Sequence, residues 1–208
     1  MLRVLGSSFL LVLSISASAS ELMLSTFLGE KYIGRDKWGA MVSKHSDLAC
    51  RGRLVEEDCK ELATFHHTSD IVAYRKDGSP SLKAEKKVVK AVDDYCVNNR
   101  GWPDIGYHFL VGLSGRVYEG RPYKYRGAHT KDLNSKNIGI AFIGCFDEVG
   151  CTESGLEVTE VTDELIDSTV KLLVVLSLKD DFKISKETVI PRSVHELAAN
   201  GRSRFPHI

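Results

Sequence analysis

The sequence lacks an excess of charge of either sign. Its 28 basic and 28 acidic side chains cancel over 208 residues. Without a net field, binding to a polyanion needs a local basic patch, and the sequence shows none, so we expect no nucleic-acid partner. A second long apolar run is also missing after the N-terminal one, so we expect no membrane span. The 43% of hydrophobic residues suffices for one ordinary globular domain.

The N-terminus has the pattern of a secretory signal peptide. Arg3 precedes an apolar stretch at 4–15, which the small residues of 17–19 follow as an A-x-A-like cleavage site. An N-terminal anchor is the alternative, but the stretch is shorter than the roughly 20 apolar residues of a membrane span. We therefore predict a signal peptide at 1–19, a lead segment at 20–34, one domain at 35–208, and a secreted, extracellular protein.

Cysteine is scarce and odd in number. Five cysteines in an oxidising compartment allow at most two internal disulfides and leave one thiol or an intermolecular link. Cys145 and Cys151 close a short polar loop and are the preferred pair. Cys50, Cys59 and Cys96 compete for a second bond, and the sequence does not choose among them. A metal cluster of cysteines is disfavoured because no C-x-x-C spacing occurs.

Hydrophobic periodicity predicts an α/β fold, a mixed central β-sheet flanked by helices. The nearly continuous apolar run at 138–144 is typical of a central strand that is covered on both faces. Residues 62–67 turn polar at their end, as a buried strand does when it delivers side chains to a site. In chain order we expect a strand at 62–67, an amphipathic helix capped by Ser81, a hairpin at 107–119, a strand at 138–144, a helix from about 162 that buries Leu165, Ile166, Thr169, Leu173 and Leu176, and a short strand at 189–190.

Six segments carry a family resemblance. In their order and spacing they resemble the animal peptidoglycan recognition proteins, which are relatives of the zinc-dependent N-acetylmuramoyl-L-alanine amidases of type 2. The resemblance spans roughly residues 35–195 and implies the mixed-sheet fold of that family. The segments are 38–40, 65–68, 101–112, 117–121, 127–130 and 138–144.

The resemblance implies a zinc site with an incomplete donor set. It puts His66 and His195 in ligand positions and Tyr107 beside the metal, where a phenol can hydrogen-bond a developing oxyanion in an active enzyme. His67 is the less favoured ligand because its side chain should point to the opposite face of a regular strand. Ser203 stands where family amidases carry a cysteine, and a hydroxyl is a poor replacement for a thiolate. We expect zinc to be weakly held or lost.

The end of the chain strengthens this interpretation. Residues 205–208 resemble the family's terminal Trp-Pro-His-Phe, reached about ten residues early, so the domain's C-terminal end is shortened. Family members with serine in place of the cysteine resemble receptors that bind peptidoglycan without cutting it. We favour such a non-catalytic sensor of innate immunity. A surviving zinc amidase is the main alternative, and a structural or partner-binding protein that has lost the groove is a third.

A muramyl peptide offers amides, a sugar and free carboxylates, so its groove needs polar side chains, an aromatic floor and a cation. Arg121, with Gly101 and Trp102, matches the family pattern for peptides containing meso-diaminopimelic acid, whose extra carboxylate a guanidinium can grip through two hydrogen bonds. Core packing for Trp102 and solvated loop positions for the polar residues are the alternatives. Whether a homodimer or a signalling partner forms stays open. By resemblance, the groove residues are Thr68, Arg100, Gly101, Trp102, Tyr107, His129 and Asn134.

Overall fold

A computed structural model of the chain describes residues 19–43, 54–57, 59–69 and 80–192. The predicted signal segment up to residue 18 and the predicted metal-site residues His195 and Ser203 lie outside this part of the chain, as does Cys50. None of the described helices is both long and apolar enough to cross a membrane.

The described strands form one mixed six-stranded sheet in the order β1-β4-β3-β5-β2-β6. β3 and β4 pair antiparallel as the predicted hairpin, and the other neighbours pair parallel. The α/β fold predicted from the sequence is therefore confirmed. The strands are β1 (Tyr32–Ile33), β2 (Leu62–His67), β3 (Phe109–Val111), β4 (Val117–Glu119), β5 (Asn137–Phe142) and β6 (Val189–Pro191).

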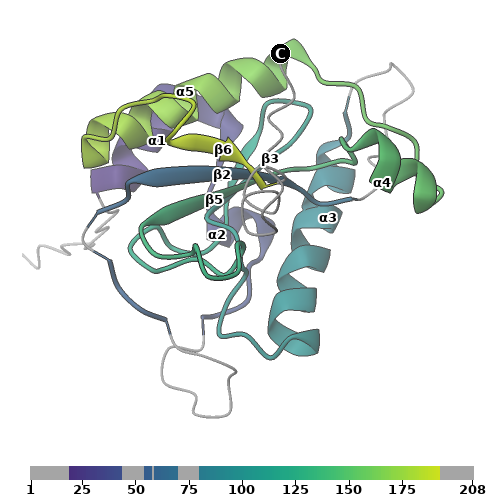
Figure 1. Cartoon of the computed structure of the whole chain (residues 1–208), viewed down its shortest axis with the longest axis horizontal. Coiled ribbons are helices and arrows are strands. Elements are labelled where there is room, and N and C mark those ends of the chain that lie inside the picture. Colours follow the sequence, from purple (N-terminus) through teal and green to yellow (C-terminus); the bar gives the residue numbers. More distant parts are fainter. Residues whose placement is uncertain (1–18, 44–53, 58, 70–79, 193–208) are drawn as a thin grey trace, which may run out of the picture.

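Helices cover both sides of the sheet. Figure 1 shows α1 (Ala19–Leu28) and α5 (Asp163–Asp180) together on one side and α3 (Leu82–Asp94) on the other. β5 is buried along nearly its whole length, as expected of a strand between two helical layers. The short helices α2 (Arg35–Trp38) and α4 (Glu148–Glu153) complete the described helical elements of α type.

The two long predicted helices begin at side-chain caps. Ser81 accepts a hydrogen bond from the backbone N–H of Ala84, and Thr162 accepts one from that of Leu165, so each satisfies an amide that the first turn leaves unpaired. One predicted core residue of α5 is wrong. Ile166 is 50% exposed, because the helix turns its buried face toward Leu165, Thr169 and their neighbours one turn on.

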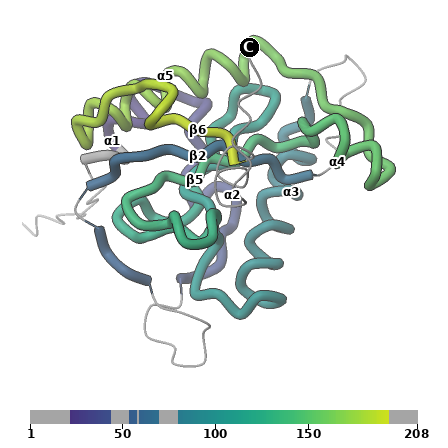
Figure 2. Tube along the Cα trace, viewed as in Figure 1, coloured from purple at the N-terminus to yellow at the C-terminus, as the bar shows by residue number. Residues whose placement is uncertain are grey.

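The segment predicted as a lead, 20–34, carries regular structure. α1 packs on α5, which follows it by more than a hundred residues, and Figure 2 shows the two side by side. Leu24 and Leu28 are buried in this contact, and β1 adds an edge strand to the sheet by pairing with β4. Residues 19–33 thus contribute to the same hydrophobic core as the rest of the domain.

Candidate functional site

A cavity of about 790 Å³ opens where several elements meet, within the size range of small-molecule sites. One wall is the C-terminal half of α3 with the π-helical turn at Tyr95–Asn99, and the other is the loop before β5. Thr68 and Arg192 directly follow β2 and β6, two parallel strands whose carboxyl ends meet at this edge. The lining residues are Thr68, Ala91, Val92, Tyr95, Cys96, Arg100, Trp102, Gly106, Tyr107, Ala128, His129, Thr130, Lys131, Asn134 and Arg192.

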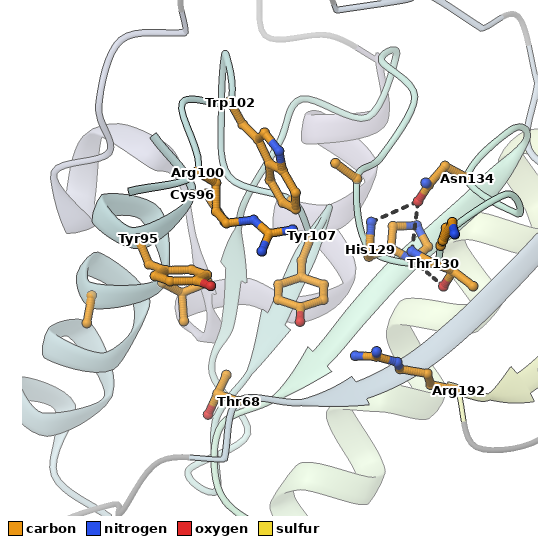
Figure 3. A pocket seen from close by; sticks show the side chains of 15 residues that line it. Thr68, Tyr95, Cys96, Arg100, Trp102, Tyr107, His129, Thr130, Asn134 and Arg192 are labelled. Atoms are coloured by element: carbon orange, nitrogen blue, oxygen red, sulfur yellow. Dashed lines mark hydrogen bonds between the residues drawn. The ribbon is translucent and has the colours of Figure 1, made fainter. Parts of the chain in front are cut away.

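A stack of three side chains forms one wall of the cavity. The Arg100 guanidinium lies over the ring of Trp102, 5.0 Å from its centroid, and 6.0 Å from the centroid of Tyr95 (Figure 3). Gly101 makes this arrangement reachable, because its φ of 67° reverses the chain between the two partners in a region that favours glycine. The backbone N–H of Trp102 then donates to the carbonyl of Cys96 at 2.9 Å. Gly101 therefore acts through the turn and is not itself a lining residue.

The opposite wall is shaped by Asn134. Its Oδ1 accepts hydrogen bonds from the backbone N–H groups of His129 at 2.8 Å and Thr130 at 2.9 Å (Figure 3). This amide therefore fixes the loop that presents His129, Thr130 and Lys131 to the cavity. The residue was predicted as a ligand contact, and in the structure it also has this local role.

Tyr107 stands at the base of the cavity. Its ring centroid is 5.1 Å from that of His66, which is 5% exposed and lies at the end of β2. Burial raises the pKa of Tyr107 above its usual value, so its hydroxyl stays protonated at neutral pH and is able to donate a hydrogen bond.

A second contact fixes the orientation of His66. Its Nε2 lies 3.1 Å from Nδ1 of His129, and Nε2 of His129 lies 3.2 Å from the carbonyl oxygen of Asn137. Because a carbonyl only accepts, His129 carries its proton on Nε2, and its Nδ1 is then the acceptor for His66 in the neutral state. A metal ion would accordingly have to approach His66 from Nδ1.

His67 points to the other face of the strand. Its Nδ1 accepts from the backbone N–H of Phe146 at 3.3 Å and lies 3.4 Å from the hydroxyl of Ser69. The alternation of side chains along β2 therefore separates the two neighbouring histidines, and only His66 faces Tyr107 and His129.

The family's zinc chemistry needs about three protein ligands around one position. Within the part of the chain that the structure describes, no cluster of three or more His, Cys, Asp or Glu side chains could hold a metal ion. The described donors thus do not fit such a site, because His66 has only His129 beside it and that contact already uses Nε2. The predicted ligand His195 and its neighbour in the donor set, Ser203, lie outside the described residues.

Arg121 was predicted to grip a ligand carboxylate, but the structure does not bring it to the cavity. It is 3% exposed, and its Nε, Nη1 and Nη2 donate to the carbonyl oxygens of Ile105, Arg126 and Asp104 at 2.7, 2.8 and 3.0 Å. These carbonyls replace the water that a buried guanidinium loses. Arg121 therefore holds together the loops behind the cavity, and the arginines that line it are Arg100 and Arg192.

The disulfide between Cys145 and Cys151 is present and braces the rim of the cavity. Just before it, the backbone N–H of Gly144 donates to the hydroxyl of Thr68 at 3.2 Å, and the carbonyl of Gly144 accepts from Ser69 at 3.0 Å. Thr68 is thus tied to the disulfide loop. Of the cysteines left open by the sequence, Cys59 and Cys96 are unpaired, and Cys96 is buried at the cavity wall.

Several lining residues escaped the sequence analysis. Tyr95 and Cys96 follow Val92 by three and four positions, so the helical period could have placed all three on one face. Lys131 belongs to a loop with no periodicity. Arg192 reaches the cavity through the pairing of β6 with β2, a contact between distant segments that leaves no local signal in the sequence.

Comparison with known proteins agrees with this fold. A family model described as N-acetylmuramoyl-L-alanine amidase matches residues 61–206. The chain is 47% identical over 128 residues to Peptidoglycan-recognition protein SC1a/b of Drosophila simulans, an alignment that covers 61% of this chain and 65% of that protein. It is 34% identical over 117 residues to Peptidoglycan-recognition protein SC2 of the same organism, covering 56% of each. The chain thus spans less than two thirds of the length of these relatives.

A solved structure has the same architecture. It contains tracheal cytotoxin bound to the ectodomain complex of the peptidoglycan recognition proteins LCa and LCx, and matches with a TM-score of 0.61 and 25% identity over 78% of this chain and 84% of that one. The family model alone covers well over half of the chain. The chain therefore belongs to the N-acetylmuramoyl-L-alanine amidase family and, within it, to the peptidoglycan recognition proteins.

Proposed function

We propose that this chain is a secreted protein of innate immunity that binds peptidoglycan fragments of the diaminopimelic-acid type without hydrolysing them. The observation that carries the proposal is the charge of the cavity. Arg100, Lys131 and Arg192 line it, and no acidic side chain is among the described lining residues. Such a site favours a ligand with free carboxylates, which form the strongest hydrogen bonds with cationic donors.

The uncharged lining suits the rest of a muramyl peptide. Trp102 and Tyr95 offer aromatic faces, and Thr68, Thr130 and Tyr107 offer hydroxyl groups to the amides of an extended peptide. The ligand named in the similar complex of LCa and LCx supports the same class of ligand for this chain. Secretion rests on the signal pattern at 1–19.

The absence of catalysis is proposed from the chemistry of the donor set. Ser203 takes the position of the family's cysteine, and a serine hydroxyl stays protonated near neutral pH, whereas a zinc site needs deprotonated ligands. The described donors around His66 do not make up the difference. We derive no hydrolytic step for this chain.

The test combines binding with product analysis. Mature protein is incubated with insoluble diaminopimelate-type peptidoglycan, with and without added zinc, and both sedimented protein and new amine termini are measured. We expect binding that survives EDTA and no new amine termini. Failure to sediment with peptidoglycan under any condition would reject the proposal and favour a protein that has lost the groove.

A zinc-dependent N-acetylmuramoyl-L-alanine amidase is the second candidate. It is favoured by one observation, the placement of Tyr107 beside His66 with ring centroids 5.1 Å apart, where a phenol could assist a metal-bound reaction. This candidate requires release of stem peptide that EDTA abolishes, together with about one tightly bound zinc per chain. The two readouts of the same incubation separate it from the sensor.

A further inference from the structure

We infer that Arg100 is the residue that reads a free carboxylate on the bound peptide, and so sets the preference for diaminopimelate over residues without that group. This inference rests on the proposed function and names the group that the cavity recognises. It assigns to Arg100 a specificity that the sequence pattern places at Arg121.

The first step is the way in which Arg100 is held. The two aromatic contacts, with Trp102 at 5.0 Å and Tyr95 at 6.0 Å, lie within the range of cation–π interactions. Such contacts use the face of the planar guanidinium, whereas its N–H donors lie in the plane. The stack therefore limits the movement of the side chain without occupying the donors that bind a carboxylate.

The second step is that these donors have no acidic partner within the described residues. No ion pair or side-chain hydrogen bond joins Arg100 to any of them, although the residue lines the cavity. Figure 3 shows Arg100 between Trp102 and Tyr95, beside Tyr107. A bidentate pair with a carboxylate is the interaction for which such a planar cation is suited.

The third step is the contrast with Arg121. Each of its three side-chain nitrogens donates to a backbone carbonyl, and the residue is 3% exposed. Gripping a ligand from this position would abandon carbonyls that have no water to replace the lost donor. Arg192 and Lys131 line the far side of the cavity and are suited to a second anionic group of the ligand.

The experiment compares two soluble muramyl peptides by calorimetric titration. They are identical except that the side-chain carboxylate of diaminopimelate is free in one and amidated in the other. For the wild type we expect about tenfold tighter binding of the free acid, the size of one charge-assisted interaction. Arg100→Gln should abolish this preference and change the affinity for the amidated peptide by less than about twofold.

Matched variants separate reading from general electrostatics. Lys87→Gln removes one positive charge from the exposed face of the same helix, outside the cavity, and should retain the preference. Arg100→Lys keeps the charge but loses the planar donors, so its preference should be intermediate. A preference that survives in Arg100→Gln, or is lost only in a folded Arg121→Lys variant, would overturn the inference.

The wild type distinguishes this inference from the proposed function. Equal affinity for the two peptides would reject the role of Arg100 and leave peptidoglycan binding intact. No affinity for either peptide would reject the proposed function itself.

Discussion

Two arginines near the cavity have opposite surroundings. Arg121 lies behind it, buried and hydrogen-bonded to the carbonyls of Asp104, Ile105 and Arg126, whereas Arg100 lies on its wall, exposed and stacked on Trp102. The first arrangement spends its donors on the protein, and the second keeps them for a ligand. The same side chain can therefore serve stability in one place and recognition in the other, and burial decides which.

The largest expected effect is on stability behind the cavity. Arg121→Leu leaves three carbonyl groups without their donor, so we expect the free energy of unfolding to fall by about 3–5 kcal/mol. Urea denaturation of the variant and the wild type measures the loss. A variant as stable as the wild type would show that Arg121 does not hold these loops, and would remove one side of the comparison.

The disulfide tests whether the rim of the cavity depends on a covalent brace. Replacing both Cys145 and Cys151 by serine opens a short loop and should cost about 2 kcal/mol by the chain-entropy relation. Because Gly144 ties this loop to Thr68, peptide affinity should also fall. Cys59→Ser is the control and should change neither property. Unchanged affinity in the double variant would show that Thr68 keeps its place without the brace.

His108 gives the region behind the cavity a pH dependence. Its Nδ1 accepts from the backbone N–H of Gly139 at 2.9 Å and its Nε2 donates to the carbonyl of Tyr125 at 2.8 Å, which fixes a neutral ring. Burial, with a smaller contribution from Lys60, lowers the pKa of His108 well below 6.5. The unfolded chain therefore binds this proton more readily, and the stabilisation is complete above about pH 6.5 and is lost as the pH falls.

The expected slope is at most about 1.4 kcal/mol per pH unit for one proton. Denaturation midpoints between about pH 7.5 and 5.5 measure it in the wild type and in His108→Gln, which cannot titrate in this range. The slope should be smaller in the variant, whereas His67→Gln, on the other face of β2, should keep it. A slope that is identical in all three proteins would assign the pH dependence to other groups.

The smallest effect is expected where the sequence difference is equally drastic. Arg100→Leu removes a charge from an exposed wall, so the free energy of unfolding should change by less than about 0.5 kcal/mol. The same urea experiment measures it beside Arg121→Leu. A loss comparable to that of Arg121→Leu would show that the stack on Trp102 is a structural support, and the contrast between the two arginines would disappear.

The regular elements with strong local signals were predictable from the sequence. Ser81 and Thr162 mark the starts of α3 and α5, and the turn at Ser114 and Gly115 marks the hairpin of β3 and β4. α1 was missed because it follows the signal pattern directly and owes its place to packing on α5. α4 was missed because it is a single short helix inside the disulfide loop.

The candidate site was predictable in its residues but not in their burial. The family motifs located Thr68, Trp102, Tyr107, His129 and Asn134, all of which line the cavity. A motif gives no measure of solvent exposure, and for this reason Arg121 was taken for a ligand contact. Lysine and arginine side chains contributed by loops and edge strands depend on distant chain pairing, which local patterns do not encode.

The most direct test of the central claim is a map of backbone amide chemical shifts during titration with a soluble diaminopimelate-type muramyl peptide. Binding in the described cavity predicts that the largest shifts cluster at Arg100, Trp102, Gly106 and Thr130, with α1 and α5 unaffected. Saturable shifts confined to α1 and α5, or no shifts at millimolar peptide, would contradict the assignment of this cavity as the peptidoglycan-binding site.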